Sequence, residues 1–355
     1  MIDYIEINNY KSIKSLKMEM KNRNILVGAN GAGKTNLISF FKLLNELSEE
    51  RLQEFIAKSG GIDNILYFGS QTSDYIYAKV NFSRNTYEMM LSPDDVGDYY
   101  FSNEKISYFT PYNTDYKESI GNYKKESQLN KTNTPVANYV RDYFNSFKVY
   151  HFHDTSSSAK VKQLCNVDDN RYLRYDASNL AAFLYRIKKT NPENFQRIEE
   201  TIRLVAPYFD KFKLEPSATN DSLIRIEWQE KGSDKYFNAH HFSDGTLRMI
   251  CLITILLQPT LPTTIIIDEP ELGLHPYAIF ILSELIKSVE EESQIILSTQ
   301  SVTLINHFTP EDLIVVDKEN NESTFKRPNA EELEVWLEDY TLGEIWGKNI
   351  IGGRP

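Results

Sequence analysis

The chain has 355 residues, 41% hydrophobic and 25% charged, a balance that excludes an intrinsically disordered chain and allows a sizeable core. This length predicts two domains, or one domain with a large insertion. Because the net charge is −11, any contact with nucleic acid would have to come from a local basic patch rather than from the overall field.

Cysteine content and apolar runs narrow the class of protein further. Cys165 and Cys251 lie far apart in the sequence and form no metal or disulfide pattern, which is consistent with a reducing compartment. The first ten residues lack the basic and apolar segments of a signal peptide. The longest apolar run, residues 249–257, is too short to cross a bilayer. We therefore expect a soluble, cytoplasmic protein without membrane contact.

Hydrophobic periodicity predicts most of the secondary structure. The expected strands cover residues 2–8, 15–20, 24–27, 75–82, 86–91, 147–153, 221–230, 235–242, 263–270, 294–301, 312–318 and 323–328. The expected helices cover residues 34–47, 177–189, 192–209, 245–258, 276–291 and 330–340, with Asp176 or Ser178 capping the second and Pro192 beginning the third. Several of these strands are apolar on both faces and are joined by helices, which predicts a parallel sheet covered on both sides.

Residues 92–147 differ in character from the rest of the chain. They are rich in Tyr, Asn, Ser and Lys and contain turn-forming stretches such as residues 92–98 and 110–116. We expect a solvated surface insertion, formed as a loop or a hairpin, because Glu residues interrupt the Lys residues. The alternative is that the interleaved Tyr and Lys side chains hold a single strand of nucleic acid.

The segment "GANGAGKT", residues 28–35, matches the phosphate-binding pattern G-x-x-x-x-G-K-[ST] between an expected strand and an expected helix. Its three glycines permit the backbone angles with which successive N–H groups wrap a phosphate chain. The lysine is expected to reach the β- and γ-phosphates of ATP, and the threonine hydroxyl to bind Mg²⁺. The nucleotide-binding residues expected in this segment and directly after it are Gly28, Asn30, Gly31, Gly33, Lys34, Thr35 and Asn36.

A second motif, "TIIIDEP", places two carboxylates at the end of an apolar strand. Ligands bind at the carboxyl ends of parallel strands, so Asp268 is expected to hold Mg²⁺ opposite Thr35. Glu269 follows on the other face of the strand end and is expected to polarise the attacking water. Glu269 and Lys34 are therefore the expected catalytic residues. A carboxylate directed at water favours hydrolysis over a kinase reaction, and the absence of an Asn-Lys-x-Asp motif disfavours a GTPase.

The segment "FSDGT", residues 242–246, opens the expected helix 245–258 and raises the question of a second phosphate site. A hydroxyl and free N–H groups at a helix N-terminus bind phosphate well. Since the first loop already surrounds a triphosphate, Ser243 and Gly245 could complete a nucleotide bound by a second copy, giving a head-to-tail dimer with two shared sites. The alternative is an ordinary helix cap at Ser243.

The motifs "GANGAGKTN", "FSDGT", "IIIDEPELGLHP" and "STQS", in this order, resemble the ABC-type ATPase heads of the RecF, SMC and OLD group. With "YKSIKSL" near the start and "GEIWGKNIIGGRP" near the end, the chain is more similar to stand-alone AAA/RecF-like ATPases that carry no nuclease domain. The resemblance implies an α/β P-loop NTPase of ABC-head type, with a mixed β lobe and a parallel-sheet lobe flanked by helices. The expected division is an N-terminal ATPase lobe at 1–91, a variable insert at 92–147, and the remainder of the head at 148–355.

The resemblance also implies roles for individual residues. Ser243, Asp244 and Gly245 would form the signature, and residues 271–275 the D-loop-like turn. Gln71 would be a Q-loop residue that senses Mg²⁺ and the attacking water. Gln300 stands where many heads carry a switch histidine; it can donate a hydrogen bond to a γ-phosphate but carries no positive charge. We therefore expect slow basal turnover, or activity that waits for a partner.

Histidines near these motifs have two interpretations. His151 and His153 alternate on one strand next to Asp154, a spacing that would suit a metal, but no Cys or further His lies nearby to complete three ligands. Packing and hydrogen bonding are the expected roles of this pair. His240, His241 and His275 are expected to be structural.

Two functional hypotheses follow. In the first, the protein is a Mg²⁺-dependent ATPase whose dimerisation, or assembly into a higher oligomer, acts as a switch in anti-phage defence or DNA repair. Its output would then lie on a separate effector protein, because only a short segment follows Gln300. In the second, the head is an ATP-binding scaffold that holds an effector, and hydrolysis only resets it.

Overall fold

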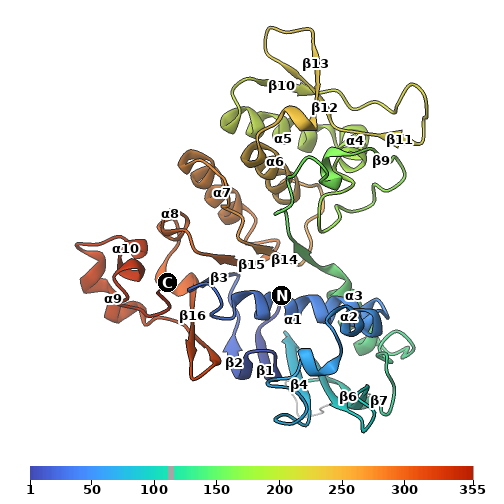
Figure 1. Ribbon diagram of the computed structural model, residues 1–355, viewed down its shortest axis with the longest axis vertical. Helices are drawn as coiled ribbons and strands as arrows, with labels where there is room; N and C mark the ends of the chain where they lie inside the picture. The colour runs from blue at the N-terminus through green and yellow to red at the C-terminus, as the bar shows by residue number, and fades with distance from the viewer. Residues whose placement is uncertain (111–115, 355) are drawn as a thin grey trace.

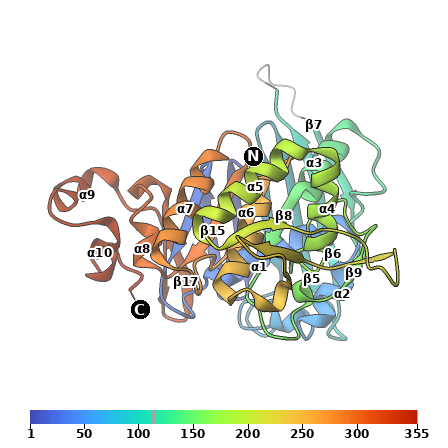
Figure 2. The same ribbon diagram turned by 90° about the horizontal axis from the view of Figure 1, so that it is seen from above.

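The computed structural model describes residues 1–110 and 116–354 of the chain. An antiparallel sheet forms the lower part in Figure 1, and a parallel sheet with helix α1 lies above it. A helical part with short strands lies on the far side of the parallel sheet. Seen from above, α5, α6 and α7 lie across the parallel sheet, while α8 to α10 gather at one side (Figure 2). Among the described residues, no helix is long and apolar enough to span a membrane.

The antiparallel sheet has the strand order β2-β1-β4-β5-β6-β7. Buried and more exposed residues alternate along its strands, most regularly in β4, so one face of the sheet is part of a core. Its strands are β1 (Tyr4–Tyr10), β2 (Ile13–Glu19), β4 (Ile76–Phe82), β5 (Asn85–Pro93), β6 (Tyr99–Tyr108) and β7 (Tyr116–Gly121).

The second sheet has the order β17-β16-β3-β15-β14-β8 and is parallel except for β17. Every residue of β14 is buried, as expected for a strand covered on both faces. Ile265 and Ile267 belong to the core under the helical part, whereas Ile266 belongs to the core shared with α1 and the antiparallel sheet. The strands are β3 (Arg23–Val27), β8 (Phe147–Tyr150), β14 (Thr264–Asp268), β15 (Gln294–Thr299), β16 (Leu313–Glu319) and β17 (Glu322–Lys326).

The remaining elements complete the two cores. The helices are α1 (Lys34–Ser48), α2 (Leu52–Lys58), α3 (Pro135–Ser146), α4 (Leu180–Thr190), α5 (Pro192–Val205), α6 (Asp244–Leu256), α7 (Pro276–Ser288), α8 (Val302–Ile305), α9 (Ala330–Leu337) and α10 (Leu342–Gly347). The short strands are β9 (Cys165–Asn166), β10 (Phe209–Phe212), β11 (Leu223–Ile224), β12 (Glu227–Glu230) and β13 (Tyr236–Asn238).

Local capping explains where the expected elements differ from the observed ones. Helix α4 begins after Asn179, so neither Asp176 nor Ser178 caps it; Asp176 instead accepts a hydrogen bond from the Ser178 N–H in the preceding turn. Pro192 begins α5 as expected. The strand expected at 235–242 stops at Asn238, whose side chain accepts from the His240 N–H at 3.0 Å and starts a 3₁₀ turn.

Most of residues 92–147 form regular structure. They include β6, β7 and α3, and both strands extend the antiparallel sheet. Phe144 of α3 is fully buried, with its ring centroid 5.1 Å from that of Tyr87. The expectation of a loop is wrong for β6 and α3, because Tyr99, Phe101, Tyr143 and Phe144 are buried core residues. β7 has no buried residue and pairs with β6 as a hairpin, the other form expected, although residues 111–115 lie outside the described part. The boundaries 1–91, 92–147 and 148–355 stay predictions.

A buried carboxylate connects β6 to β5 and to the segment after β7. Glu104 of β6 is fully buried and accepts hydrogen bonds from the Tyr87 hydroxyl (2.8 Å), the Ser127 hydroxyl and the Gln128 N–H (2.9 Å). Burial raises the pKa of Glu104, and these hydrogen bonds oppose the rise. The carboxylate therefore depends on all three donors.

Replacing Tyr87 by Phe should lower the free energy of unfolding by about 2 kcal/mol, because a hydrogen bond to a buried charged group is lost. The difference from the wild type should shrink as the pH falls through the raised pKa of Glu104, where the carboxyl group becomes neutral. Urea unfolding at several pH values measures both effects. Tyr77→Phe on β4 is the control and should cost less than about 0.5 kcal/mol. Equal losses in the two variants would contradict the role of Glu104.

Candidate functional site

The phosphate-binding loop lies between β3 and α1, with its backbone against β16. Gly31 and Gly33 have φ of 76° and 121°, which only glycine adopts easily. A Cβ atom on Gly28 would lie 2.2 Å from the carbonyl oxygen of Val316. The glycines are therefore required by backbone angle at two positions and by the neighbouring strand at the third.

Three hydroxyl and amide groups hold the loop from the side. The Asn36 amide donates to the Ser12 hydroxyl at 2.6 Å, Ser12 lies 2.6 Å from the Ser323 hydroxyl, and Ser323 donates to the Ala32 carbonyl at 2.5 Å. Asn36 thus points toward the β1–β2 turn, and its contact with nucleotide stays a prediction. Sequence reasoning missed Ser12 and Ser323, because only the fold brings them to the loop.

Lys34 is almost fully buried at the mouth of the loop. Its ammonium donates to the carbonyls of Gly28 (2.6 Å) and Ala29 (2.9 Å). Burial lowers the pKa of Lys34, while Glu269, Asp268 and Glu271 act in the opposite direction. The positive charge is thus held where the β- and γ-phosphates of ATP are expected.

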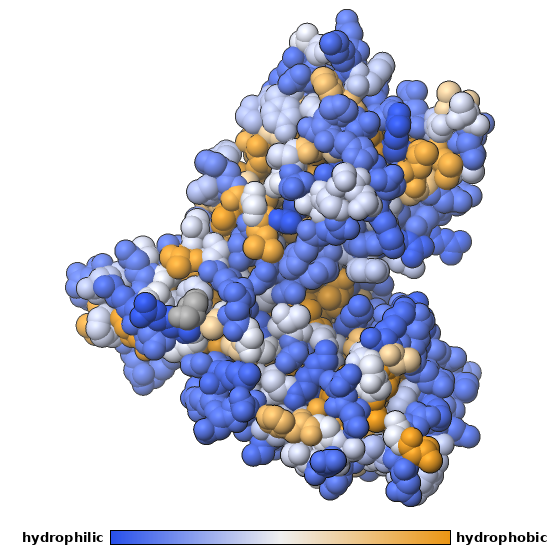
Figure 3. Space-filling view, in the orientation of Figure 1, coloured by the Kyte–Doolittle hydropathy of each residue, from blue (hydrophilic) through white to orange (hydrophobic). Residues whose placement is uncertain are grey.

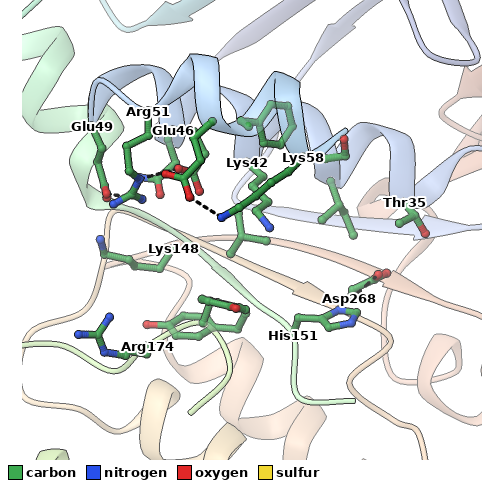
Figure 4. Close-up of a pocket in the computed structure, with 18 of the residues that line it drawn as sticks. Thr35, Lys42, Glu46, Glu49, Arg51, Lys58, Lys148, His151, Arg174 and Asp268 are labelled. Carbon is green, nitrogen blue, oxygen red and sulfur yellow. Dashed lines mark hydrogen bonds and ion pairs between the residues drawn. The ribbon is translucent and has the colours of Figure 1, made fainter. Parts of the chain in front are cut away.

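Asp268 and Thr35 line the same cavity (Figure 4). Asp268 ends β14, and its Oδ1 accepts a hydrogen bond from the Ser298 hydroxyl of the adjacent strand β15. Thr35, in the first turn of α1, is exposed. A hydroxyl and a carboxylate on one cavity are hard oxygen ligands, which fit Mg²⁺.

A hydrogen-bonded bridge joins three of the expected site residues. The Gln300 amide, directly after β15, donates to Asn30 Oδ1 at 2.8 Å and to Glu269 Oε1. Glu269 has a φ of 43°, and its N–H donates to the Ser298 carbonyl at 3.1 Å, so the chain turns sharply after β14. The structure therefore brings Asn30, Glu269 and Gln300 together, and their shared contact with nucleotide stays a prediction.

Glu271 is a buried member of the site that sequence reasoning placed only within a turn. Its Oε1 accepts from the Thr299 hydroxyl (2.6 Å) and from the Gln300 N–H (3.1 Å). Its Oε2 is buried without a hydrogen-bond partner, and burial raises the pKa of this carboxyl group. Glu271 fixes the backbone of Gln300, and no sequence signal beyond its closeness to Glu269 points to this role.

His151 and His153 follow β8, which pairs with β14. His151 Nδ1 lies 3.9 Å from Asp268 Oδ2, and His153 Nε2 donates to the Asp268 carbonyl at 3.0 Å. The pKa of His151 is lowered by burial and by His153. Within the described residues no group of three His, Cys, Asp or Glu could hold a metal, and Asp154 bonds Ser156 of its own loop. The two histidines pack on each other and His153 hydrogen-bonds, as expected for the pair, although the sequence did not indicate Asp268 as the partner.

The signature residues lie in the helical part, across the parallel sheet from α1 (Figure 1). Ser243 is exposed and caps α6, because its hydroxyl accepts from the Thr246 N–H at 3.2 Å. The exposed Asp244 pairs with Lys162 at 3.3 Å. A Cβ atom on Gly245 would lie 2.2 Å from the Gly273 carbonyl oxygen, so α6 packs tightly on the turn 271–275. The capping interpretation is confirmed, and the shared site stays a prediction.

Arg248, one turn further along α6, links this helix to the chain on both sides of the sheet edge that carries Asp268 and Glu269. It is almost fully buried and donates to the carbonyls of Phe152 (2.9 Å), His153 (3.3 Å) and Leu272. These carbonyls belong to the segment after β8 and to the turn 271–275.

Gln71 is exposed on the turn before β4 and does not line the cavity of Asp268, so its proposed role stays a prediction.

Comparisons with known proteins agree with this geometry. The family model described as "AAA domain, putative AbiEii toxin, Type IV TA system" matches residues 23–306. A crystal structure of an Smc head bound to the C-winged helix domain of ScpA has a TM-score of 0.62 at 15% identity, covering 95% of this chain and 99% of that one. A Pyrococcus furiosus Smc head bound to the C-terminal domain of ScpA has a TM-score of 0.54 at 16% identity, covering 95% and 98%. No curated protein matches the chain.

Gly28→Ala should weaken ATP binding about tenfold, because the added methyl group overpacks against the backbone of β16 at a cost of about 1–3 kcal/mol. Fluorescence titration with a labelled ATP analogue and Mg²⁺ measures the affinity. Gly347→Ala, where a Cβ atom meets nothing within 4 Å, should bind normally. Unchanged affinity in Gly28→Ala would show that contact with Val316 does not constrain the loop.

Proposed function

The chain belongs to the AbiEii-type AAA domain family and has the fold of an Smc head, and on this basis we propose that it is a Mg²⁺-dependent ATP hydrolase that dimerises around ATP. The observation that carries the proposal is the meeting of Lys34, Asp268 and Glu269 at one edge of the parallel sheet. Phosphoryl transfer depends mainly on positioning and charge stabilisation, which such an edge provides.

Each residue has a role that follows from its position. Lys34 exchanges its carbonyl partners for the phosphates, and Glu269 accepts a proton from the attacking water. Thr35 and Asp268 would hold Mg²⁺, which when bound neutralises charge on the β- and γ-phosphates. The Gln300 amide donates to Glu269 Oε1 in this arrangement, which restrains the carboxylate and leaves its second oxygen for the attacking water. This restraint supports slow basal turnover.

The second half of each site would come from another copy. Ser243 and Asp244 are exposed at the N-terminus of α6, and this helix lies across the sheet from the phosphate-binding loop of its own chain. A helix N-terminus favours a phosphate. A two-fold, head-to-tail arrangement would therefore place Ser243, Asp244 and Gly245 of one copy against the γ-phosphate held by the other.

The biological role follows less directly. The family description names a toxin of a type IV toxin–antitoxin system, and the two Smc heads are bound to parts of ScpA. These parallels support a switch that works with a separate effector protein in defence or DNA repair. Contact with nucleic acid through a local patch, a higher oligomer and location in the cytoplasm stay predictions.

The bond between Gln300 and Glu269 also favours the second candidate, an ATP-binding scaffold in which hydrolysis only resets the complex. The two candidates share the ATP-bound dimer and differ in what the effector requires. In the scaffold, ATP binding alone is the signal. In the switch, turnover is the signal.

Glu269→Gln should lower ATP turnover about 100-fold or more, because general-base catalysis is lost, and should accumulate a dimer with Mg²⁺ and ATP. Phosphate release and light scattering after size exclusion measure the two effects. Glu291→Gln, an exposed carboxylate after α7, should behave as the wild type. If the variant stays monomeric, the dimer proposal is wrong; if it retains the biological output, the scaffold is favoured.

Mixing two inactive variants tests whether the sites are shared. Lys34→Ala has a defective phosphate-binding loop and an intact signature. Ser243→Arg has an intact phosphate-binding loop and a defective signature. Random pairing in a two-fold dimer should restore roughly a quarter of the wild-type rate, since one intact site forms in each mixed dimer. Ser243→Arg mixed with the Lys34→Ala/Ser243→Arg double variant is the control and should stay inactive. Activity of Ser243→Arg alone would place the complete site within one chain.

A further inference from the structure

A cleft of about 700 Å³ runs from the Mg²⁺-binding end of α1 along this helix to α2. The α1 and α2 side of the cleft faces β8 and residues 172–175, as Figure 4 shows. In the space-filling view the surface is hollowed between the two parts of the molecule (Figure 3). This volume lies in the range of small-molecule sites. We call it the lysine cleft, after Lys42 and Lys148, which line it.

Lys42 and Lys148 differ from the other cations of the cleft. Arg51 pairs with Glu46 and Glu49, Lys58 with Glu54, and Arg174 with Asp169. Within residues 1–110 and 116–354, Lys42 and Lys148 form neither an ion pair nor a hydrogen bond through their ammonium groups. Burial lowers the pKa of Lys148, so its charged form is poorly solvated. Lys42 is exposed to solvent, and an anionic ligand in the cleft could pair with both ammonium groups.

Each of the two lysines lies over a tyrosine ring. Lys42 Nζ is 5.5 Å from the ring centre of Tyr175, and Lys148 Nζ is 5.0 Å from that of Tyr172. The tyrosines are 57% and 52% exposed, so their flat faces remain available in the cleft. Aromatic faces beside cations bind bases and phosphates together.

The Lys42 end of the cleft is separate from the expected triphosphate position, although the cleft extends to that position. Lys42 lies eight residues after Lys34 on α1, which corresponds to about 12 Å along the helix. Thr35 and Asp268 line the near end of the same cleft. A ligand at Lys42 would therefore lie beside the ATP site without occupying it.

We propose that the lysine cleft is a second site for a phosphorylated nucleoside, with Lys42 and Lys148 on the phosphate and Tyr172 and Tyr175 on the base. The nucleoside is either free or at the end of a single strand. Binding at this site does not depend on the proposed hydrolysis and is measured without it.

Calorimetry on the full chain, with Mg²⁺ and one molar equivalent of a non-hydrolysable ATP analogue per chain, tests the site, because an excess of the analogue would compete with the probes for the cleft. The probes are adenosine 5′-monophosphate, a 5′-phosphorylated tetrathymidylate and its unphosphorylated form. We expect a phosphorylated probe to bind, and Lys42→Ala and Lys148→Ala each to weaken it about tenfold. Tyr175→Ala should weaken it as well, and Tyr175→Phe should retain it. Lys189→Ala removes a lysine that lies 4.2 Å from the Tyr185 ring centre outside the cleft, and should have no effect.

The outcomes distinguish a free nucleotide from the end of a single strand, and they also show which results would contradict the proposal. Binding of the monophosphate supports the site with a free nucleotide, and binding of the phosphorylated strand alone supports it with a strand end. The proposal is overturned if no probe binds, if the unphosphorylated strand binds equally well, or if binding is insensitive to Lys42 and Lys148. Each variant must first bind the ATP analogue like the wild type; Lys42→Gln and Lys148→Gln replace any alanine variant that does not.

Discussion

The parallel register of three neighbouring strands is the constraint on which the site depends. Val27 at the end of β3 pairs with Thr299 of β15, and Ser298 of β15 pairs with Asp268 of β14. The chain therefore leaves all three strands at one edge, toward the phosphate-binding loop, Gln300 and Glu269. Burial of both faces of β14 fixes this register, because a shift by one residue would exchange the side chains of its two cores.

The charges at this edge depend on one another. Lys34 is the cation among three nearby carboxylates, Asp268, Glu269 and Glu271. Burial alone would favour the neutral forms of Lys34 and Glu271. The nearby carboxylates oppose this for Lys34, and the hydrogen-bond donors oppose it for Glu271. The excess of carboxylates at this edge would favour a bound cation such as Mg²⁺, and Lys34 is the group there that would attract phosphate.

The sequence predicted the catalytic strands and helices well, because β3, β14 and β15 are apolar runs that end in recognisable motifs. It did not predict that β6 and α3 belong to the core, since their buried aromatic residues are mixed with Lys and Asn. It also missed contacts made across long sequence distances, such as Ser323 on Ala32 and His153 on Asp268. Contacts of this kind depend on sheet order, which local patterns do not contain.

The close approach of Gly245 to the Gly273 carbonyl leaves no room between the signature helix and the turn 271–275. Arg248 of the same helix donates hydrogen bonds to that turn and to the segment after β8. Because of these contacts, a molecule that displaces α6 would also displace the backbone around Glu271. In the proposed dimer, loss of one nucleotide would consequently alter the geometry around the other.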